Sequence, residues 1–260
     1  LEAIRAFVQE TKDKSLAARA ALLGAAVAAS GHTPDHAAVV DLLNGFETRY
    51  PDARDLHSSA LELRLGARVG SDRIEGADKD LDAFLALPPD GERRRTLARV
   101  ARDLATRAER ASPADSAPTL ALARKAYAAL VARDGTASDR ITLADLQLRA
   151  GDPTGAQRLF EEVLRADPTS AEALRGAARA SAAAGDREHA LAYWRTVLDA
   201  SPTGGTAWYE ARVAQVTLLT EDGRRAQACE LLRASRGRAT SAGGDTLEAR
   251  LRDLEPTVCR

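Results

Sequence analysis

A stretch of twenty residues recurs in this chain after 34 positions. When residues 151–170 are overlaid on residues 185–204, eight positions are identical, and the bulky pair Leu159-Phe160 coincides with Tyr193-Trp194. The identical residues of the first copy are Gly151, Asp152, Ala156, Val163, Leu164, Ala166, Pro168 and Thr169. Self-similarity at a fixed period of this length is typical of repeat architectures, in which each unit is a small supersecondary motif.

The residues of the repeated unit predict a helix hairpin. Gly151 stands where one helix ends, since glycine adopts positive φ without steric cost. In the next helix the small Ala156 and the large Phe160 are four residues apart, so they share one face. Pro168 ends this helix because it lacks the amide donor. Such a hairpin leaves an apolar face uncovered, so each unit must stack on its neighbours.

The spacing of alanine, aromatic residue and proline resembles that of the tetratricopeptide repeat family. Residues 137–236 carry this resemblance, and a third unit opens with Trp208 and turns at Gly223. Arg212 departs from the pattern, because the two earlier units have Ala144 and Ala178 at that position. The resemblance implies an all-α fold, namely a right-handed α-solenoid of stacked antiparallel helix hairpins with a C-terminal capping helix.

The domain organisation follows from where the repeat signal is strong. No segment alternates apolar and polar residues between hairpin turns, so no sheet is expected. We predict a degenerate helical-repeat region at residues 1–110, followed by a linker or inter-helix connection at 111–118. The tetratricopeptide-like repeats then span residues 119–236, and a capping helix with a tail spans 237–260.

Capping residues predict the ends of two further helices. Thr33 as a cap before Pro34 predicts a helix that continues to about residue 50. In the tail, Asp245 is the expected cap of a helix that runs to about Leu254 and is ended by Pro256.

Composition excludes several function classes. The chain has 37 basic and 38 acidic residues, and this balance disfavours a nucleic-acid partner. No run of apolar residues is long enough to predict a membrane span. The chain starts at Leu1 and contains no Met, which indicates a processed or shortened N-terminus.

No motif predicts catalysis, a cofactor or a metal site. His32 and His36 have a metal-binding spacing, but Pro34 lies between them and no third ligand is near. No glycine-rich phosphate loop or nucleophile elbow is present. We therefore expect a non-enzymatic protein without a cofactor.

The family resemblance points to the first helix of each hairpin as the partner-binding element. In tetratricopeptide-like arrays these helices line the concave groove, where a protein or peptide partner binds. The residues predicted to bind it are Asp145, Leu148, Arg149, Glu172, Arg175, Arg179, Tyr209, Val213 and Val216. Plain solvent exposure is the alternative interpretation of each.

Two cysteines, Cys229 and Cys259, bear on localisation. They form a disulfide if the capping helix returns antiparallel to the preceding helix; otherwise Cys229 is a buried thiol and Cys259 a tail thiol. A bond persists only in an oxidising compartment, so it favours an extracytoplasmic, periplasmic location. The segment from Trp208 to Arg212, with the helix after it, also resembles the C-terminal end of large bacterial repeat proteins, many of which act in the cell envelope.

These observations favour a protein-interaction scaffold, as a component of a bacterial envelope assembly or secretion system. Two alternatives stay open. One is an accessory or regulatory helical-repeat domain of a larger enzyme or complex, and the other is a structural spacer that assembles with itself. The oligomeric state is left open by the sequence.

Overall fold

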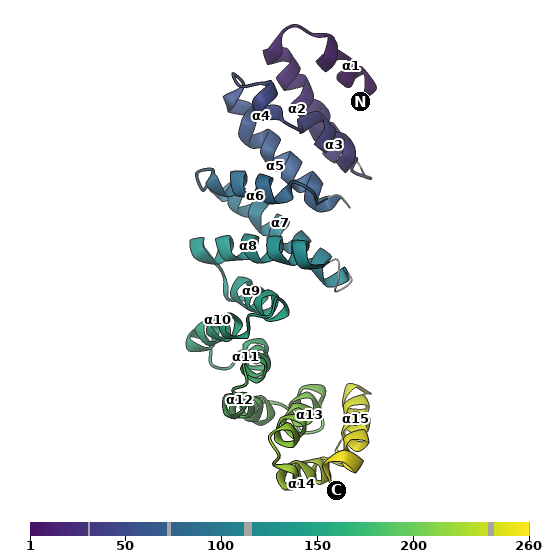
Figure 1. Cartoon of the computed structure of the whole chain (residues 1–260), viewed down its shortest axis with the longest axis vertical. Coiled ribbons are helices and arrows are strands. Elements are labelled where there is room, and N and C mark those ends of the chain that lie inside the picture. The colour runs from purple at the N-terminus through teal and green to yellow at the C-terminus, as the bar shows by residue number, and fades with distance from the viewer. Residues whose placement is uncertain (31, 72–73, 112–115, 239–241, 260) are drawn as a thin grey trace. The chain divides into compact units, whose positions relative to one another are not determined.

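The computed structural model describes residues 1–30, 32–71, 74–111, 116–238 and 242–259. Within these ranges the regular structure consists of helices, fifteen in number, with no strand (Figure 1). The predicted all-α fold of stacked helix hairpins is therefore confirmed. The chain forms two compact units, Leu1–Asp134 and Gly135–Arg260.

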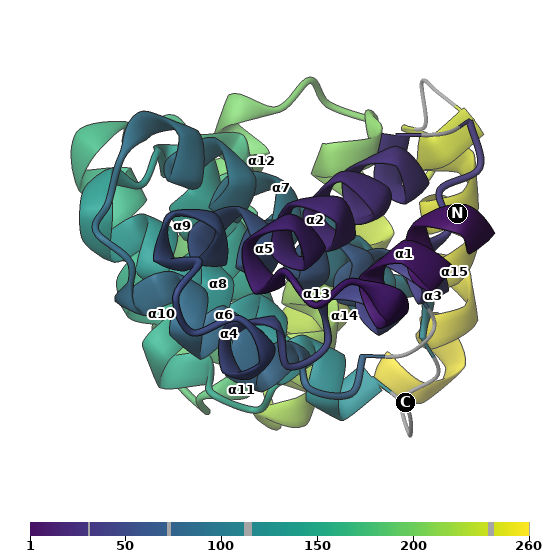
Figure 2. The same cartoon turned by 90° about the horizontal axis from the view of Figure 1, so that it is seen from above.

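The first unit is built from eight helices in its described residues. They are α1 (Glu2–Glu10), α2 (Lys14–Ser30), α3 (His36–Leu43), α4 (Phe46–Arg49), α5 (Arg54–Gly70), α6 (Ala77–Ala86), α7 (Gly91–Arg110) and α8 (Ser116–Asp134). Neighbouring helices pack on each other; α1 lies beside α2 in both views, and α7 packs along α8 (Figures 1 and 2). Many residues of this core are alanines, so α2 and α3 can approach each other closely.

The helix predicted from Thr33 to about residue 50 is wrong in both its start and its continuity. Its cap is Asp35, whose side chain accepts a hydrogen bond of 2.9 Å from the Ala38 amide, so Pro34 lies outside the helix. Gly45 then adopts a φ of 62° and separates α3 from α4. A glycine in the left-handed region cannot continue a right-handed helix.

The second unit consists of three hairpins and a final helix. The hairpins pair α9 (Ala137–Arg149) with α10 (Pro153–Ala166), α11 (Ala171–Ala183) with α12 (Arg187–Ala200), and α13 (Thr206–Glu221) with α14 (Arg225–Ala234); α15 spans Ala242–Val258. The predicted turn glycines Gly151, Gly185 and Gly223 all have positive φ. Asp152 and Asp186 cap the helices that follow the first two of these turns.

The small-then-large pairs of the repeat lie in the core, as expected from their spacing. Ala156 and Phe160 are fully buried, and so is Ala190, with Trp194 nearly so. The Phe160 ring lies directly against the backbone of Gly176 on α11, where a methyl group would overlap it. The stacking of α10 on α11 thus depends on a large ring opposite a residue without a side chain.

The last helix is longer at both ends than predicted. It begins at Ala242, before the expected cap at Asp245, and Pro256 lies inside it. A proline inside a helix removes one backbone donor, and its ring crowds the carbonyl four residues earlier. The Cys259 amide still donates to the Glu255 carbonyl at 2.9 Å, so the helical bonding continues past the proline.

Residues 111–118, predicted as a linker or inter-helix connection, lie within the first unit, after α7. Residues 112–115 lie outside the described residues, and α8 begins at Ser116. The division of the chain in the structure follows Asp134.

Candidate functional site

Two ion pairs join the first helices of successive hairpins across one surface. The Nη2 atom of Arg179 on α11 lies 3.3 Å from Oδ1 of Asp145 on α9. The Nε atom of Arg175 on α11 lies 3.9 Å from Oε2 of Glu210 on α13. The paired residues are separated by about one repeat, so equivalent helices present them side by side.

Six of the nine predicted partner-binding residues are accessible on α9 and α11. Asp145, Leu148 and Arg175 are half-buried, whereas Arg149, Glu172 and Arg179 are exposed. The surface combines both signs of charge with one partly exposed leucine. We call these six residues the first-helix surface.

The other three predicted residues, Tyr209, Val213 and Val216, are buried, and this corrects their assignment to an open groove. The capping helix α15 packs against α13, and its Leu251 belongs to the same apolar core. Sequence spacing placed these residues on the first helix of the third hairpin, but it could not show which element covers them.

Tyr209 has a structural role in this core. Its hydroxyl donates a hydrogen bond of 2.6 Å to the Ser235 carbonyl after α14. Burial, followed by the negative charge of Glu248 on α15, raises the pKa of its phenol. A tyrosine that satisfies its hydroxyl inside the unit offers nothing to a partner.

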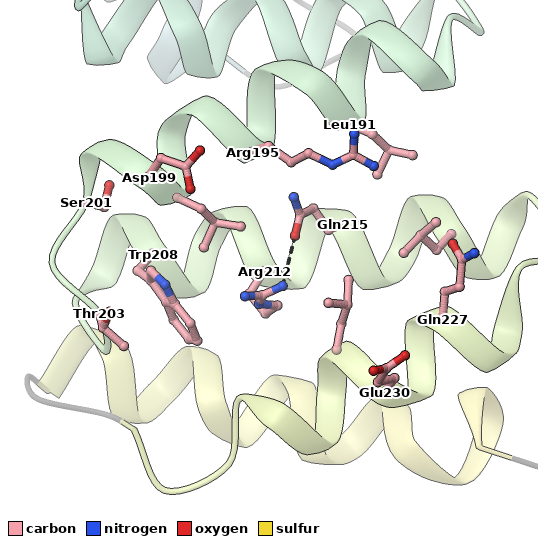
Figure 3. A pocket seen from close by; sticks show the side chains of 13 residues that line it. Leu191, Arg195, Asp199, Ser201, Thr203, Trp208, Arg212, Gln215, Gln227 and Glu230 are labelled. Atoms are coloured by element: carbon pink, nitrogen blue, oxygen red, sulfur yellow. Dashed lines mark hydrogen bonds between the residues drawn. The ribbon is translucent and has the colours of Figure 1, made fainter.

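A cavity of about 770 Å³ lies between α12, α13 and α14 (Figure 3). Its floor comes from α13, with Trp208, Arg212 and Gln215, and its walls from α12 and α14. The remaining lining residues are Leu191, Arg195, Leu198, Asp199, Ser201, Thr203, Leu219, Gln227, Glu230 and Leu231. Sequence reasoning missed this cavity, although Arg212 in place of alanine was the signal that the third unit packs differently.

The two cysteines lie together at the end of the second unit. The Sγ atoms of Cys229 and Cys259 are 2.08 Å apart and the Cα atoms 5.1 Å apart, which is the separation of a disulfide-bonded pair. Cys229 lies on α14 and Cys259 directly follows α15, so a bond would join the capping helix to the last hairpin.

The described residues hold neither a candidate metal site nor a candidate membrane span. They contain no group of three or more histidine, cysteine, aspartate or glutamate side chains arranged to hold a metal ion. In the same part of the chain, no helix has the length and apolar character needed to cross a membrane.

Comparison with known proteins identifies the repeats. Residues 147–214 match the sequence model of the tetratricopeptide repeat family. This segment runs from the end of α9 into α13 and includes both copies of the 34-residue unit. The sequence matches no curated protein at a significant level.

Three solved structures are similar to this chain over most of its length, all at low sequence identity. A tetratricopeptide repeat protein from Parabacteroides merdae has 15% identity and a TM-score of 0.42, covering 100% of this chain and 97% of that chain. The assembly chaperone of RpL4, Acl4, has 17% identity and a TM-score of 0.32, covering 98% and 95%. Yeast Tom70 has 13% identity and a TM-score of 0.28, covering 96% and 67%. The family match therefore shows tetratricopeptide repeats in residues 147–214, within the hairpins of the second unit.

Proposed function

We propose that this protein is a non-enzymatic scaffold that holds a protein or peptide partner on the first-helix surface. The observation that carries the proposal is the two ion pairs that link α11 to α9 and to α13. They indicate that the three helices expose charged side chains on the same face. The tetratricopeptide repeat is a fold of protein-interaction scaffolds, and its first helices are the ones that face a bound chain.

The ion pairs of the first-helix surface can be replaced by ion pairs to a partner. Arg179 and Asp145 are solvent-accessible, and an exposed ion pair contributes only about 0–1 kcal/mol. Replacing it with pairs to a partner therefore costs little. Leu148 supplies apolar area beside these charges, as in interfaces where a buried contact is surrounded by polar groups.

Site-specific photo-crosslinking tests this proposal. A photoreactive amino acid is placed at Arg149 or Glu172 on the first-helix surface, and at Arg158 on α10 as an exposed control on a second helix. In extracts of the source cells we expect a defined crosslinked protein from the first two positions and none from the control.

The charge-reversal variant Arg175→Glu with Arg179→Glu provides the specificity test. It removes both cross-helix ion pairs and reverses the charge of the surface without touching the core, so the crosslinks should disappear while the helical content is retained. Crosslinks that persist in this variant, or that arise equally from Arg158, would refute the assignment.

We further propose that the protein acts outside the cytoplasm, as a component of a bacterial envelope assembly or secretion system. The support is the closeness of Cys229 and Cys259, because a disulfide is maintained only in an oxidising compartment. Thiols are counted in the denatured, unreduced protein purified from its source. No titratable thiol is the expected result, and two would contradict this location.

Self-assembly, or docking as an accessory domain of a larger complex, is a second candidate that one observation favours. Leu16, Leu23 and Val27 follow each other along α2 at helical spacing, and each is at least half exposed. Phe7 on α1, the helix that packs on α2, is also exposed. Sedimentation of wild-type and Leu23→Gln protein distinguishes the cases: dissociation of an oligomer by the variant supports self-assembly, and a monomer in both excludes it.

A further inference from the structure

In the cavity between α12, α13 and α14, Arg212 forms no ion pair with any residue that the structure describes. Arg212 lies at its centre with its guanidinium 5.0 Å from the centroid of the Trp208 ring (Figure 3). Its Nη1 atom donates a hydrogen bond of 3.2 Å to Oε1 of Gln215, a neutral acceptor. Its Nε atom is buried and has no hydrogen-bond partner among the described residues.

The carboxylates of the lining do not neutralise this arginine. Asp199 on α12 and Glu230 on α14 are exposed and form no ion pair with Arg212. Burial, and then the positive charge of Arg238, lower the pKa of Arg212. Burial and the charge of Arg238 thus both disfavour the charged form of Arg212. An anion bound beside this guanidinium would stabilise the charged form.

A comparison with the preceding repeat shows how the cavity arises. The residues 34 positions before Arg212 and Gln215 are Ala178 and Ser181, and both are fully buried. At that junction the small side chains are enclosed by their neighbours. The third unit replaces them with two long polar side chains, and its first helix α13 is also three residues longer than α11 (16 against 13 residues). The cavity therefore occurs together with the long polar side chains and the longer first helix of the third repeat unit.

We propose that this cavity is a second binding site, separate from the first-helix surface, and that it takes an acidic side chain of an extended peptide. A guanidinium over an aromatic ring can still donate from N–H groups at its edge, and a carboxylate is the planar acceptor that matches this geometry. The apolar walls from Leu198 and Leu231 suit the residues that flank the acidic one.

The position of Arg212 decides between an internal acidic residue and a chain terminus. The α13 lining runs from Trp208 to Leu219, so it continues by about one helical turn before Arg212 and about two turns after it. A terminal carboxylate bound at Arg212 would leave the lining on one side unused. A side chain from a peptide that crosses the cavity uses both sides.

Isothermal titration calorimetry with the whole chain tests this site. The probe is a short peptide, blocked at both ends, with aspartate between two leucines; its matched controls carry asparagine in place of aspartate, or a free C-terminal carboxylate and no acidic side chain. We expect the aspartate peptide to bind at least about tenfold more tightly than either control, and the affinity to fall as salt is added.

Two variants separate the site from general effects on folding. Arg212→Ala introduces the residue that the preceding repeat has at this position, so the fold should persist, and affinity for the aspartate peptide should drop at least about tenfold. Arg165→Ala removes an exposed arginine of α10 and should leave the affinity unchanged. Circular dichroism confirms folding of each variant.

The proposal is overturned if the aspartate and asparagine peptides bind equally, or if Arg212→Ala binds as wild type does. Tight binding of the free C-terminal carboxylate alone would also overturn it, since the site would then receive a chain end. Absence of binding to folded wild-type protein at millimolar peptide would have the same consequence. The crosslinking of the first-helix surface is independent of all these outcomes, so failure of one proposal is distinguishable from failure of the other.

Discussion

At the level of single residues, Gly176 shows how closely the repeat helices approach. A methyl group at this position would overlap the Phe160 ring, which is itself fully buried. Gly176→Ala should therefore lower the free energy of unfolding by about 1–3 kcal/mol, despite the better helix propensity of alanine. Chemical denaturation of wild type and variant measures the difference.

Gly66 on α5 is the matched control for this substitution. The nearest atom to an added Cβ is Nη2 of Arg99 at 3.7 Å, an ordinary contact. Gly66→Ala should stabilise the protein by about 0.5–1 kcal/mol, because only the helix propensity changes. Equal effects at both positions would show that packing against Phe160 does not matter.

Arg64 is the centre of a buried ionic network in the first unit. Its guanidinium lies 2.8 Å from Asp80 and 3.0 Å from Glu47, and it donates to the Leu43 carbonyl at 2.7 Å. Burial tends to raise the pKa of Glu47, but the hydrogen bonds and the charge of Arg64 outweigh it, so the pKa is lowered below 4.5.

This lowered pKa predicts a pH-dependent contribution of Glu47 to stability. A carboxyl with a depressed pKa stabilises the fold above its unfolded value and loses this contribution as pH falls through the folded value. The difference in melting temperature between wild type and Glu47→Gln should thus be constant near neutral pH and shrink below about pH 4.5. A difference that grows on acidification would contradict the ion pair.

At the level of elements, a disulfide between Cys229 and Cys259 would fasten α15 to the last hairpin of the second unit. The cysteines are 30 residues apart, and a loop of that length predicts roughly 3–4 kcal/mol of stabilisation in the chain-entropy model. Under oxidising conditions Cys259→Ser should lower the unfolding free energy by this amount. With reductant present, wild type and variant should unfold alike; a difference that persists would mean that the serine, not the missing bond, is responsible.

At the level of the whole molecule, the division after Asp134 predicts that the second unit folds independently. One apolar core, which extends from Leu174 to Val258, consists entirely of described residues of this unit. A fragment of residues 135–260 should show helical circular dichroism and a cooperative thermal transition. A fragment that unfolds without a transition would show that the two units depend on each other.

The sequence by itself was enough to predict the repeat, the helix hairpins and the closeness of Cys229 to Cys259. A 34-residue period with turn glycines and a small residue four positions before a large one is a local signal, because each feature acts within one helix or turn. The prediction that Cys229 and Cys259 lie close together needed one more step, a short connection that makes the capping helix return antiparallel to the helix before it.

The tertiary structure decided which side chains of these helices are accessible to solvent and where a cavity lies between the helices. Tyr209, Val213 and Val216 occupy first-helix positions like those of Asp145 and Arg175, but they are buried in a core to which α12, α14 and α15 also contribute. The cavity around Arg212 likewise depends on how three helices meet. Burial and cavities arise from contacts between elements distant in sequence, and a period read along the chain contains no information about what covers its ends.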